Sequence, residues 1–519
     1  MNLRSLVASL PAKKGAVYTL DAGKIVRHPY AALHDQVIRA RDALRSWGVR
    51  EGSRVGIYAP NSYYWLVYDL ALIESGAISV PFTDDFAGAV NEALLERYHI
   101  ALLLTSKSNA RLFPDTPAHV AFMDADNENK RVVERSPPPE GDEADQHSLV
   151  FSSGSAGGLK GLVISRKGVE TQLPPILEAV GFNASDRLLL FLPMSNFQQR
   201  NMCYGALWLD FDVIITDYTQ LFSAMKLLHP TILIAPPVLY QMMYSEYAKF
   251  PEWKKSLWMG LGSLLTIIPS ASARRALARS LFKDFYLQFG DKMRLLVTGM
   301  APIRHNIGQF FAAMQLPLCE TYGMVEAGSL TYRPAHSREY GSVGKLLRGI
   351  TLVFEDDGEI IVQRESPMTM RYFQCADGEN ERTFVAPDRI ATGDIGKLDA
   401  RGNLFLLGRK KELIVTAGGY KIHPEVIEEE MNNCPHVANS VIFLKRDSSH
   451  LTCVVSLNQP EQEGARALVK KYVQTMQSTK KAAQFVDVIF AEEPFSRENG
   501  MLRPNMKIDR KGIAARYNI

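Results

Sequence analysis

Residues 152–161 form a glycine-rich segment whose composition suits phosphate binding. The segment, Ser-Ser-Gly-Ser-Ala-Gly-Gly-Leu-Lys-Gly, holds four glycines, three hydroxyl side chains and one lysine between apolar stretches. Glycines let successive backbone N–H groups point into one concavity, the hydroxyls add donors, and Lys160 supplies a compact positive charge. The pattern Gly-x4-Gly-Lys-Ser/Thr is absent, and residues 162–164 have the character of a strand. The segment predicts a polyphosphate-binding turn between two strands, with a plain hairpin loop as the alternative.

This segment resembles the pyrophosphate-binding motif of the adenylate-forming superfamily, which includes acyl-CoA synthetases, peptide-synthetase adenylation domains and luciferases. Further motifs that resemble those of the family follow in its usual order. They are residues 192–200 (LPMSNFQQR), 297–302 (VTGMAP), 321–326 (TYGMVE), 392–394 (TGD), 402–414 (GNLFLLGRKKELI), 418–428 (GGYKIHPEVIE) and 498–510 (ENGMLRPNMKIDR). Each motif is short, so the resemblance draws its specificity from their order.

The resemblance implies a site for ATP and Mg²⁺. The pyrophosphate part of ATP would be held by the loop residues Ser152, Ser153, Gly154, Ser155, Gly157 and Lys160. The adenosine part would be bound by Ala301, Tyr322, Gly323, Asp394 and Arg409. Within this set the Tyr322 ring would lie against the adenine, and Asp394 would accept hydrogen bonds from the ribose hydroxyls.

The same resemblance implies three catalytic residues, Glu326, Arg409 and Lys507. Glu326 would bind the Mg²⁺ that neutralises the triphosphate, and Arg409 would reach the ribose or a phosphate. Lys507 would stabilise the negative charge that builds up when a carboxylate attacks the α-phosphate in line.

The expected acid pocket comprises Asn196, Pro237 and Gly299. Residues 235–240 (APPVLY) fit the helix start that usually lines this pocket in the family, which implies a mainly apolar acid. Asn196 stands where the long-chain branch usually has histidine, and Gln199 stands where that branch has glutamate.

The resemblance therefore implies a ligase that converts an apolar carboxylic acid to an acyl-adenylate, releases pyrophosphate and passes the acyl group to a nucleophile. Coenzyme A is the first expectation, because a free-standing chain of this kind is most often an acyl-CoA ligase. The alternatives are transfer to an amino-acid amine, as in an amide ligase that resembles coronafacate ligase, and transfer to a carrier-protein thiol. A nucleotide-binding protein that no longer adenylates is disfavoured, because the key positions keep their charged side chains.

The composition is that of an ordinary globular protein without a charged field. Lysine and arginine number 59 against 56 for aspartate and glutamate, so the net charge of +3 predicts no nucleic-acid partner. The five cysteines include no Cys-x-x-Cys pair, which argues against a disulfide framework or a zinc site. The first residues lack the apolar core of a signal peptide, and we expect a cytoplasmic protein.

The uncharged stretch 256–273 approaches the length of a membrane-spanning helix. Its two glycines, its proline and its serines favour a buried or peripheral segment instead, and we expect no integral membrane segment.

Helical and strand patterns alternate along the N-terminal part. Residues 31–47 and 65–75 have helical spacing of apolar side chains, whereas 54–58 and 77–80 read as strands. This alternation predicts an α/β fold in which a large N-terminal domain is built of layered sheets and helices.

A smaller unit follows a change of composition near residue 408. It combines a helix that begins at Pro424 with strand patterns at 440–444, 451–457 and 485–490, which is typical of a small α+β domain. The predicted division is an N-terminal domain over 1–408, a hinge over 409–411 that pivots at Lys411, and a mobile C-terminal domain over 412–519.

Overall fold

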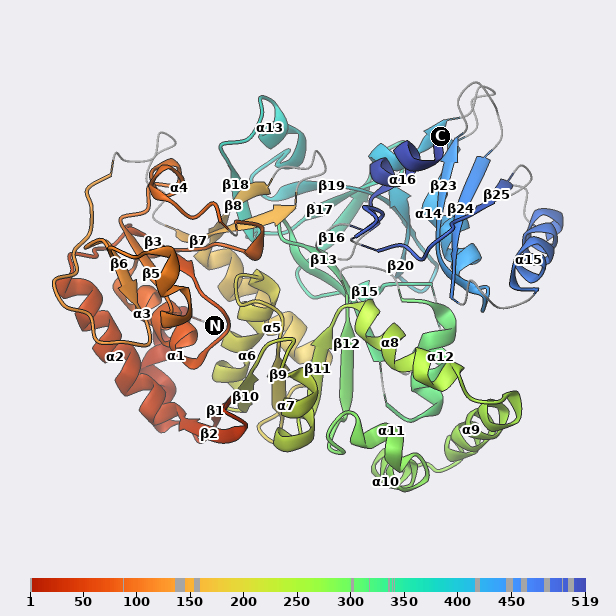
Figure 1. The fold of residues 1–519 in the computed structure, drawn as a ribbon, viewed down its shortest axis with the longest axis horizontal. Helices are drawn as coiled ribbons and strands as arrows, with labels where there is room; N and C mark the ends of the chain where they lie inside the picture. Colours follow the sequence, from red (N-terminus) through yellow and green to blue (C-terminus); the bar gives the residue numbers. More distant parts are fainter. Residues whose placement is uncertain are drawn as a thin grey trace.

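The computed structural model of the protein describes residues 2–86, 88–135, 145–153, 159–299, 303–316, 318–334, 337, 339, 341–415, 421–444, 451–458, 464–479, 486–496, 498–502 and 508–519 (Figure 1). Two large sheets with helices between and beside them form the N-terminal part, and a small sheet with its own helices forms the C-terminal part. The predicted α/β fold class is confirmed.

The larger sheet has thirteen strands among the described residues. In spatial order they are β16 (Thr351–Phe354), β17 (Glu359–Gln363), β19 (Arg389–Leu398), β20 (Asn403–Arg409), β15 (Gly344–Leu346), β14 (Gly328–Arg333), β13 (Leu318–Met324), β12 (Leu295–Thr298), β11 (Ile232–Ala235), β9 (Arg187–Leu190), β10 (Asp212–Ile215), β1 (Ala16–Asp21) and β2 (Lys24–Pro29). The strands from β13 to β1 run parallel, and from β13 to β16 neighbouring strands are antiparallel.

The smaller of the two large sheets has seven described strands. Their order is β18 (Thr369–Phe373), β8 (Leu159–Ser165), β7 (Gln146–Ser153), β4 (Ile78–Pro81), β3 (Arg54–Tyr58), β5 (Leu102–Thr105) and β6 (Val120–Phe122). The strands predicted at 54–58 and 77–80 are therefore neighbours, and β3 and β4 pair in parallel.

A central layer of helices separates the two sheets. It contains α2 (Tyr30–Ser46), α3 (Tyr63–Ser75), α5 (Arg166–Val180) and α6 (Phe197–Leu209), whose apolar side chains share one buried cluster with residues of both sheets. Because successive side chains of a strand point to opposite faces, Leu188 and Leu190 of β9 join this cluster, whereas Leu189 joins another one. That second cluster packs α7 (Leu221–Leu228), α8 (Pro237–Ala248), α11 (Lys283–Leu287) and α12 (His305–Ala313) on the outer face of the larger sheet.

The uncharged stretch 256–273 is divided between two short helices. α9 (Glu252–Leu265) ends before Pro269, and α10 (Ala271–Leu281) begins after Ser270, whose hydroxyl accepts a hydrogen bond from the Ala273 N–H. No helix in the described part of the chain has both the length and the apolarity needed to cross a bilayer.

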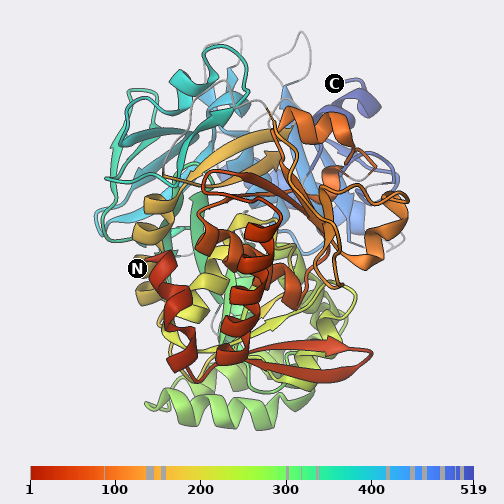
Figure 2. The ribbon, with the colours of Figure 1, turned by 90° about the vertical axis from the view of Figure 1, so that its left-hand side faces the viewer.

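The C-terminal unit begins after β20. Its elements are β21 (Ile414–Val415), β22 (Lys421–Ile422), α14 (Pro424–Asn432), β23 (Val437–Leu444), β24 (Leu451–Leu457), α15 (Ala465–Thr479), β25 (Val486–Phe490) and α16 (Arg510–Tyr517). The two faces of the sheet β23–β24–β25 hold separate apolar clusters. Figure 1 shows this unit beside the larger part, at the upper right, and in Figure 2 it lies behind N-terminal elements. Arg304, just before α12, donates to the carbonyls of Val437, at 3.0 Å, and Ala438. The division at 409–411 and the mobility of this unit stay predictions.

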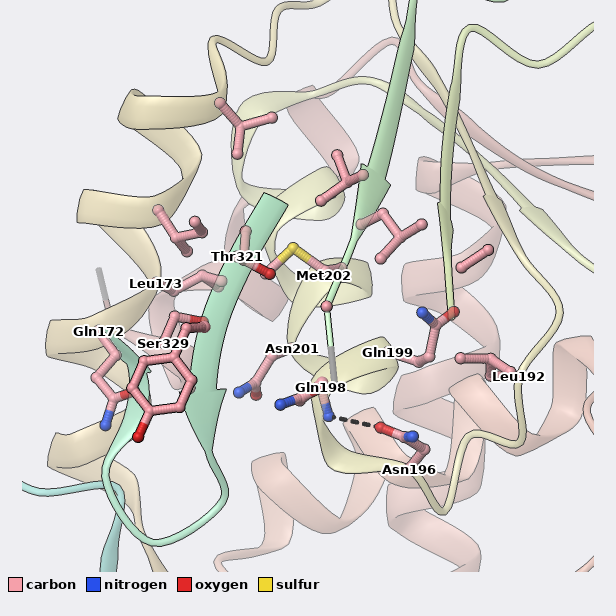
Figure 3. Close-up of a pocket in the computed structure, with 18 of the residues that line it drawn as sticks. Gln172, Leu173, Leu192, Asn196, Gln198, Gln199, Asn201, Met202, Thr321 and Ser329 are labelled. Atoms are coloured by element: carbon pink, nitrogen blue, oxygen red, sulfur yellow. Dashed lines mark hydrogen bonds between the residues drawn. The ribbon is translucent and has the colours of Figure 1, made fainter. Parts of the chain in front are cut away.

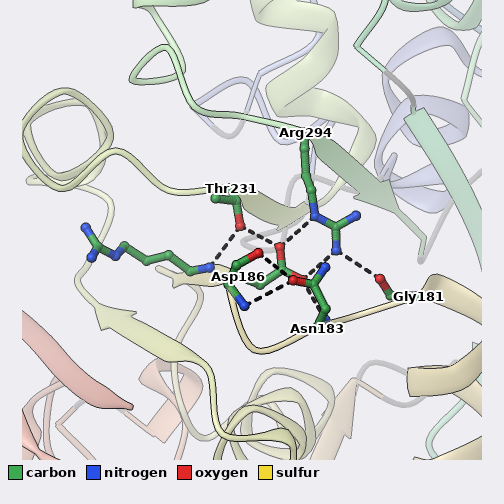
Figure 4. Close-up of polar contacts among 7 residues, drawn as sticks. Gly181, Asn183, Asp186, Thr231 and Arg294 are labelled. Atoms are coloured by element: carbon green, nitrogen blue, oxygen red, sulfur yellow. Dashed lines mark hydrogen bonds and ion pairs between the residues drawn. The ribbon is translucent and has the colours of Figure 1, made fainter. Parts of the chain in front are cut away.

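Asp186 fixes the amino ends of three parallel strands (Figure 4). Its carboxylate, directly before β9, accepts hydrogen bonds from Thr231 Oγ1 at 2.9 Å and from Arg294 Nε at 2.6 Å, residues that precede β11 and β12. The Arg294 guanidinium also donates to the carbonyl of Gly181, which ends α5. Because the amino ends are held level, the carboxyl ends of β9, β11 and β12 reach the same edge, where α/β sheets usually bind ligands.

A buried ion pair lies between the two sheets. Asp69 of α3 and Arg200 of α6 are both fully buried, with Arg200 Nη1 3.1 Å from Asp69 Oδ1. Arg200 also donates to Ser79 on β4 at 3.0 Å and to Ser148 on β7 at 2.8 Å, and the Tyr204 hydroxyl donates to Asp69. The guanidinium therefore joins two helices of the central layer to two strands of the smaller sheet.

We predict that Arg200→Met lowers the free energy of unfolding of the N-terminal part by about 3–5 kcal/mol, because it leaves the Asp69 carboxylate buried and unpaired. Urea denaturation followed by tryptophan fluorescence measures the change. The matched control is Arg4→Met, which removes an exposed pair with Glu51 and is expected to change the same free energy by less than about 1 kcal/mol. The double variant Arg200→Met/Asp69→Leu should regain part of the loss; equal destabilisation in Arg200→Met and the control contradicts the prediction.

Candidate active site

The glycine-rich segment joins two antiparallel strands, as predicted. Ser152 on β7 pairs with Lys160 on β8, and the last register pair before the turn is Ser153 with Leu159. Gly154, Ser155 and Gly157 lie outside the described residues, and of Ser153 only the backbone is described. The loop's phosphate-binding role stays a prediction.

Lys160 contacts two groups, one on β18 and one on the helix that follows it. Its ammonium pairs with Glu379, the first residue of α13 (Glu379–Thr383), and lies 4.7 Å from the centre of the Tyr372 ring. Both side chains of the ion pair are 23% exposed, so the pair faces the solvent only partly. A phosphate that binds Lys160 would have to replace Glu379.

Tyr372 connects Lys160 to Glu326. The Tyr372 hydroxyl donates a hydrogen bond of 2.8 Å to Glu326 Oε1, in the turn between β13 and β14. Burial and the nearby Glu326 carboxylate raise the pKa of Tyr372, so its hydroxyl remains a donor. The backbone N–H of Thr369 donates to the Glu326 carbonyl at 3.0 Å, which fixes this turn against β18. The predicted metal ligand thus lies close to the predicted phosphate ligand.

Asp394, Tyr322 and Arg409 form a second polar group, on the larger sheet. Asp394 and Arg409 are register partners on β19 and β20, and Arg409 Nε lies 2.6 Å from Asp394 Oδ1. The Tyr322 hydroxyl donates to Asp394 Oδ2 at 2.6 Å. Burial raises the pKa of Asp394, and the positive charge of Arg409 acts in the opposite direction. Burial, helped by Asp394, raises the pKa of Tyr322, so the phenol stays protonated.

Gly323, predicted near the adenosine, and Gly299, predicted in the acid pocket, occupy places where a side chain does not fit. A Cβ on Gly323 would lie 2.4 Å from the Gly328 carbonyl oxygen, and a Cβ on Gly299 would lie 2.8 Å from Thr321 Oγ1. Both glycines line a cavity, where the missing side chain allows the backbone to approach a ligand closely. Ala301 lies outside the described residues.

A cavity of about 900 Å³, including the open space at its mouth, adjoins these residues (Figure 3). It is bounded by α5, the start of α6, the carboxyl ends of β11 and β12, and β13. The lining includes the predicted residues Asn196 and Gly299, together with Tyr322 and Gly323. Pro237 is buried at the first turn of α8 and is not part of this lining, which reaches Ala235 on that side.

Asn196 has a structural role at the pocket. Its side-chain oxygen accepts a hydrogen bond of 3.1 Å from the Gln198 N–H and caps α6.

The residues predicted for the C-terminal part are only partly described. Lys411 lies in the one-turn 3₁₀ helix Lys410–Glu412, and its neighbour Lys410 pairs with Asp357 at 2.7 Å and Glu359 at 2.6 Å. Lys507 lies outside the described residues, and its catalytic role stays a prediction.

Four residues of the site were not predicted from the sequence: Gln172, Asn201, Tyr372 and Glu379. Tyr372 and Glu379 lie outside the motifs that resemble those of the adenylate-forming superfamily. The sequence pattern around Gln172 could have indicated a buried polar side chain. Gln172 stands one helical turn from the buried Val169 and Ile176, on the apolar side of α5.

Comparison with known proteins places the chain in a family. The family model of the AMP-binding enzymes matches residues 7–368. The long-chain-fatty-acid–CoA ligase FadD15 of Mycobacterium bovis is 26% identical over 454 residues, which cover 79% of this chain and 74% of the relative.

Two solved structures share the fold. The anthranilate CoA ligase AuaEII in complex with anthranoyl-AMP has a TM-score of 0.75 at 18% identity, with 99% of this chain and 97% of that chain covered. The o-succinylbenzoate coenzyme A synthetase MenE of Bacillus subtilis, in complex with ATP and a magnesium ion, has a TM-score of 0.70 at 19% identity, with 94% and 95% covered.

We predict that Glu379→Gln increases the affinity for ATP by about two- to fivefold. In this variant the Lys160 ammonium does not have to break an ion pair with a carboxylate before it binds phosphate. Isothermal titration calorimetry with ATP measures the dissociation constant. Glu381→Gln, an exposed change on the same helix, is the matched control and should leave this constant unchanged. Weaker binding in Glu379→Gln would mean that Glu379 orients Lys160 and does not compete with phosphate.

Proposed function

Because the chain belongs to the family of AMP-binding enzymes, we propose that it joins a carboxylic acid to the adenylyl group of ATP and then passes the acyl group to the thiol of coenzyme A. Membership of the family confirms the resemblance found in the motifs. The relatives are CoA ligases, so the prediction of an ATP-dependent, AMP-forming ligase is also confirmed at the level of enzyme class.

Tyr322 links the polar group on the larger sheet to the cavity, and this observation supports the proposal most strongly. Tyr322 takes part in the polar group with Asp394 and Arg409, and it also lines the cavity. A nucleoside that contacts Tyr322 and Asp394 would therefore have the cavity directly beside it. An acid bound in that cavity could present its carboxylate to the α-phosphate, which is the positioning that adenylation requires.

The donor set fits a nucleotide. Asp394 would accept hydrogen bonds from the ribose, Tyr322 would lie beside the adenine, and Arg409 and Lys160 would contact anionic oxygens. Within the described residues no group of three or more His, Cys, Asp or Glu side chains could hold a metal. A Mg²⁺ ion would therefore be shared between Glu326 and phosphate oxygens, which is a usual arrangement for this ion.

The reaction would proceed in two steps. In the first, a carboxylate oxygen attacks the α-phosphorus of ATP, the bond from that phosphorus to the oxygen bridging the β-phosphate breaks, and pyrophosphate leaves with the bond's electron pair. In the second, the thiol sulfur of coenzyme A attacks the acyl carbon, AMP leaves, and the thiol proton is released. The positive charges of Lys160 and Lys507 would stabilise the charge that develops in the first step.

The relatives and the cavity support our proposal for the acceptor and for the kind of acid. FadD15 is named as a CoA ligase for long-chain fatty acids, and AuaEII as one for anthranilate. Coenzyme A is therefore the acceptor that we propose, and the amide ligase alternative has no comparable support. The apolar side chains that line much of the cavity suit an acid with a mainly apolar body.

The test is a screen of the purified full chain with ATP, Mg²⁺ and a panel of fatty and aromatic acids, with either coenzyme A or mixed amino acids added. Mass spectrometry is expected to detect an acyl-CoA and AMP only in the presence of the acid and coenzyme A. An N-acyl amino acid formed without coenzyme A would overturn the acceptor. The absence of acid-dependent exchange between ATP and pyrophosphate with every acid would overturn adenylation itself.

We predict that Lys507→Ala reduces acid-dependent ATP–pyrophosphate exchange by about a hundredfold or more, because charge on the transferring group is no longer stabilised. The variant should still consume synthetic acyl-AMP with coenzyme A, since that step does not form the same transition state. Lys511→Ala, a nearby change on α16, is the matched control and should keep the exchange rate. Normal exchange in Lys507→Ala would refute the assigned role.

A further inference from the structure

Three buried amide side chains line the cavity without using all their hydrogen-bonding atoms. Gln172 is 5% exposed, Gln199 is 2% exposed and Asn201 is 7% exposed. Gln172 Oε1 and Nε2, Gln199 Oε1 and Asn201 Oδ1 are buried and have no partner in the protein. Buried polar groups are nearly always hydrogen-bonded, so four such atoms around one cavity indicate a bound molecule that supplies the partners.

Gln172 is held close to the backbone at the entrance of β14. Its Oε1 would lie 1.5 Å from a Cβ on Gly328, so only glycine at that position admits the amide. Gly328 also has a φ of +84°, which glycine adopts without strain. In Figure 3 the Gln172 side chain lies with Ser329 on one side of the cavity. Both polar atoms of this amide, a donor and an acceptor, lack a hydrogen-bond partner in the protein.

The other two amides extend from the start of α6. Asn201 Nδ2 contacts the sulfur of Met368 at 3.5 Å, which leaves Asn201 Oδ1 as the free atom. Gln199, like Asn201, offers an oxygen that accepts no hydrogen bond. Figure 3 shows both side chains, with those of Asn196 and Gln198, on the side of the cavity opposite Gln172. Asn196 differs from these two, because its oxygen is already used to cap the helix.

The rest of the lining limits what the bound group can be. Among the described lining residues none is charged, so neither a second carboxylate nor an ammonium group would find a counter-ion. The apolar lining includes Leu173, Ile176, Val180, Phe182, Met202 and Ile234. Three of the four free atoms are oxygens that need a proton donor, and the fourth is a donor itself.

We propose that the acid activated by this enzyme carries a neutral hydrogen-bond donor, a hydroxyl or an N–H group, on an otherwise apolar body, and that Gln172, Gln199 and Asn201 select it. This inference rests on the proposed adenylation of an acid in this cavity and names the substrate class. A donor on the acid supplies a hydrogen bond to an amide oxygen that has no partner in the protein. An unsubstituted acid leaves these oxygens unpaired, so it binds less favourably than the acid that carries the donor.

The experiment compares matched acids in acid-dependent ATP–pyrophosphate exchange, which needs no acceptor. The pairs are decanoic acid with its positional hydroxy isomers, and phenylpropanoic acid with its para-hydroxy derivative. The para-methoxy derivative is a third member, because it adds bulk and an acceptor but no donor. We expect at least one hydroxy acid to exceed its parent in kcat/KM by about 10- to 100-fold, and its methyl ether not to do so.

The variants Gln172→Met, Gln199→Met and Asn201→Leu keep side-chain size and remove the amide. In at least one of these variants, the ratio of kcat/KM for the hydroxy acid to kcat/KM for its parent should fall close to one. The main cause should be a higher kcat/KM for the parent acid. Met202→Leu changes the lining without removing a polar group and should alter both members of a pair by the same factor. The variants should also unfold at the same or a higher temperature, because they remove unpaired buried amides; amides with a merely structural role would lower it.

The outcomes separate this inference from the proposed function. Exchange with parent acids that equals or exceeds exchange with every hydroxy partner overturns the inference and leaves adenylation intact. A hydroxy preference that persists in all three amide variants also overturns the assignment to these residues. The absence of exchange with any acid overturns the proposed function, and the inference with it.

Discussion

The buried pair between Arg200 and Asp69 is the constraint that links the parts of this site. Arg200 donates to Ser148 on β7, the strand that leads to the glycine-rich segment, and it belongs to the same helix turn as the cavity residues Gln199 and Asn201. One guanidinium therefore sets the distance between the strand of the glycine-rich segment and the helix that lines the cavity. Two desolvated charges tolerate few arrangements, so the helices and strands around them are held in one register.

The motif at residues 192–200 gives its polar residues three different roles. Asn196 caps a helix, Gln199 lies unpaired at the cavity, and Arg200 closes the buried pair. These roles follow from the helix itself, because consecutive residues point in directions about one hundred degrees apart and meet different neighbours. Substitutions inside one short motif can therefore affect folding, helix formation and substrate choice separately.

The sequence predicts the strongly periodic elements well. Residues 31–47 correspond to α2 (Tyr30–Ser46), and the strands predicted at 54–58 and 451–457 have the observed bounds. α5 could not be predicted in this way, because Pro174 and Pro175 stand inside it and remove two backbone donors. Within the candidate site, the order of the motifs predicted the charged residues. The contacts that Lys160 makes with Tyr372 and Glu379 depend instead on the pairing of β18 with β8. Such contacts join distant segments, and spacing along the chain does not reveal them.

The two ends of the proposed nucleotide site belong to different sheets. Lys160 and Tyr372 are on the smaller sheet, whereas Tyr322, Asp394 and Arg409 are on the larger one. On the proposed assignment, ATP would cross the boundary between the sheets and contact both of them non-covalently. The bond broken in the first step would be the one that spans this boundary. Adenylation would then leave pyrophosphate with one sheet and the acyl-adenylate with the other, so the two products could depart separately.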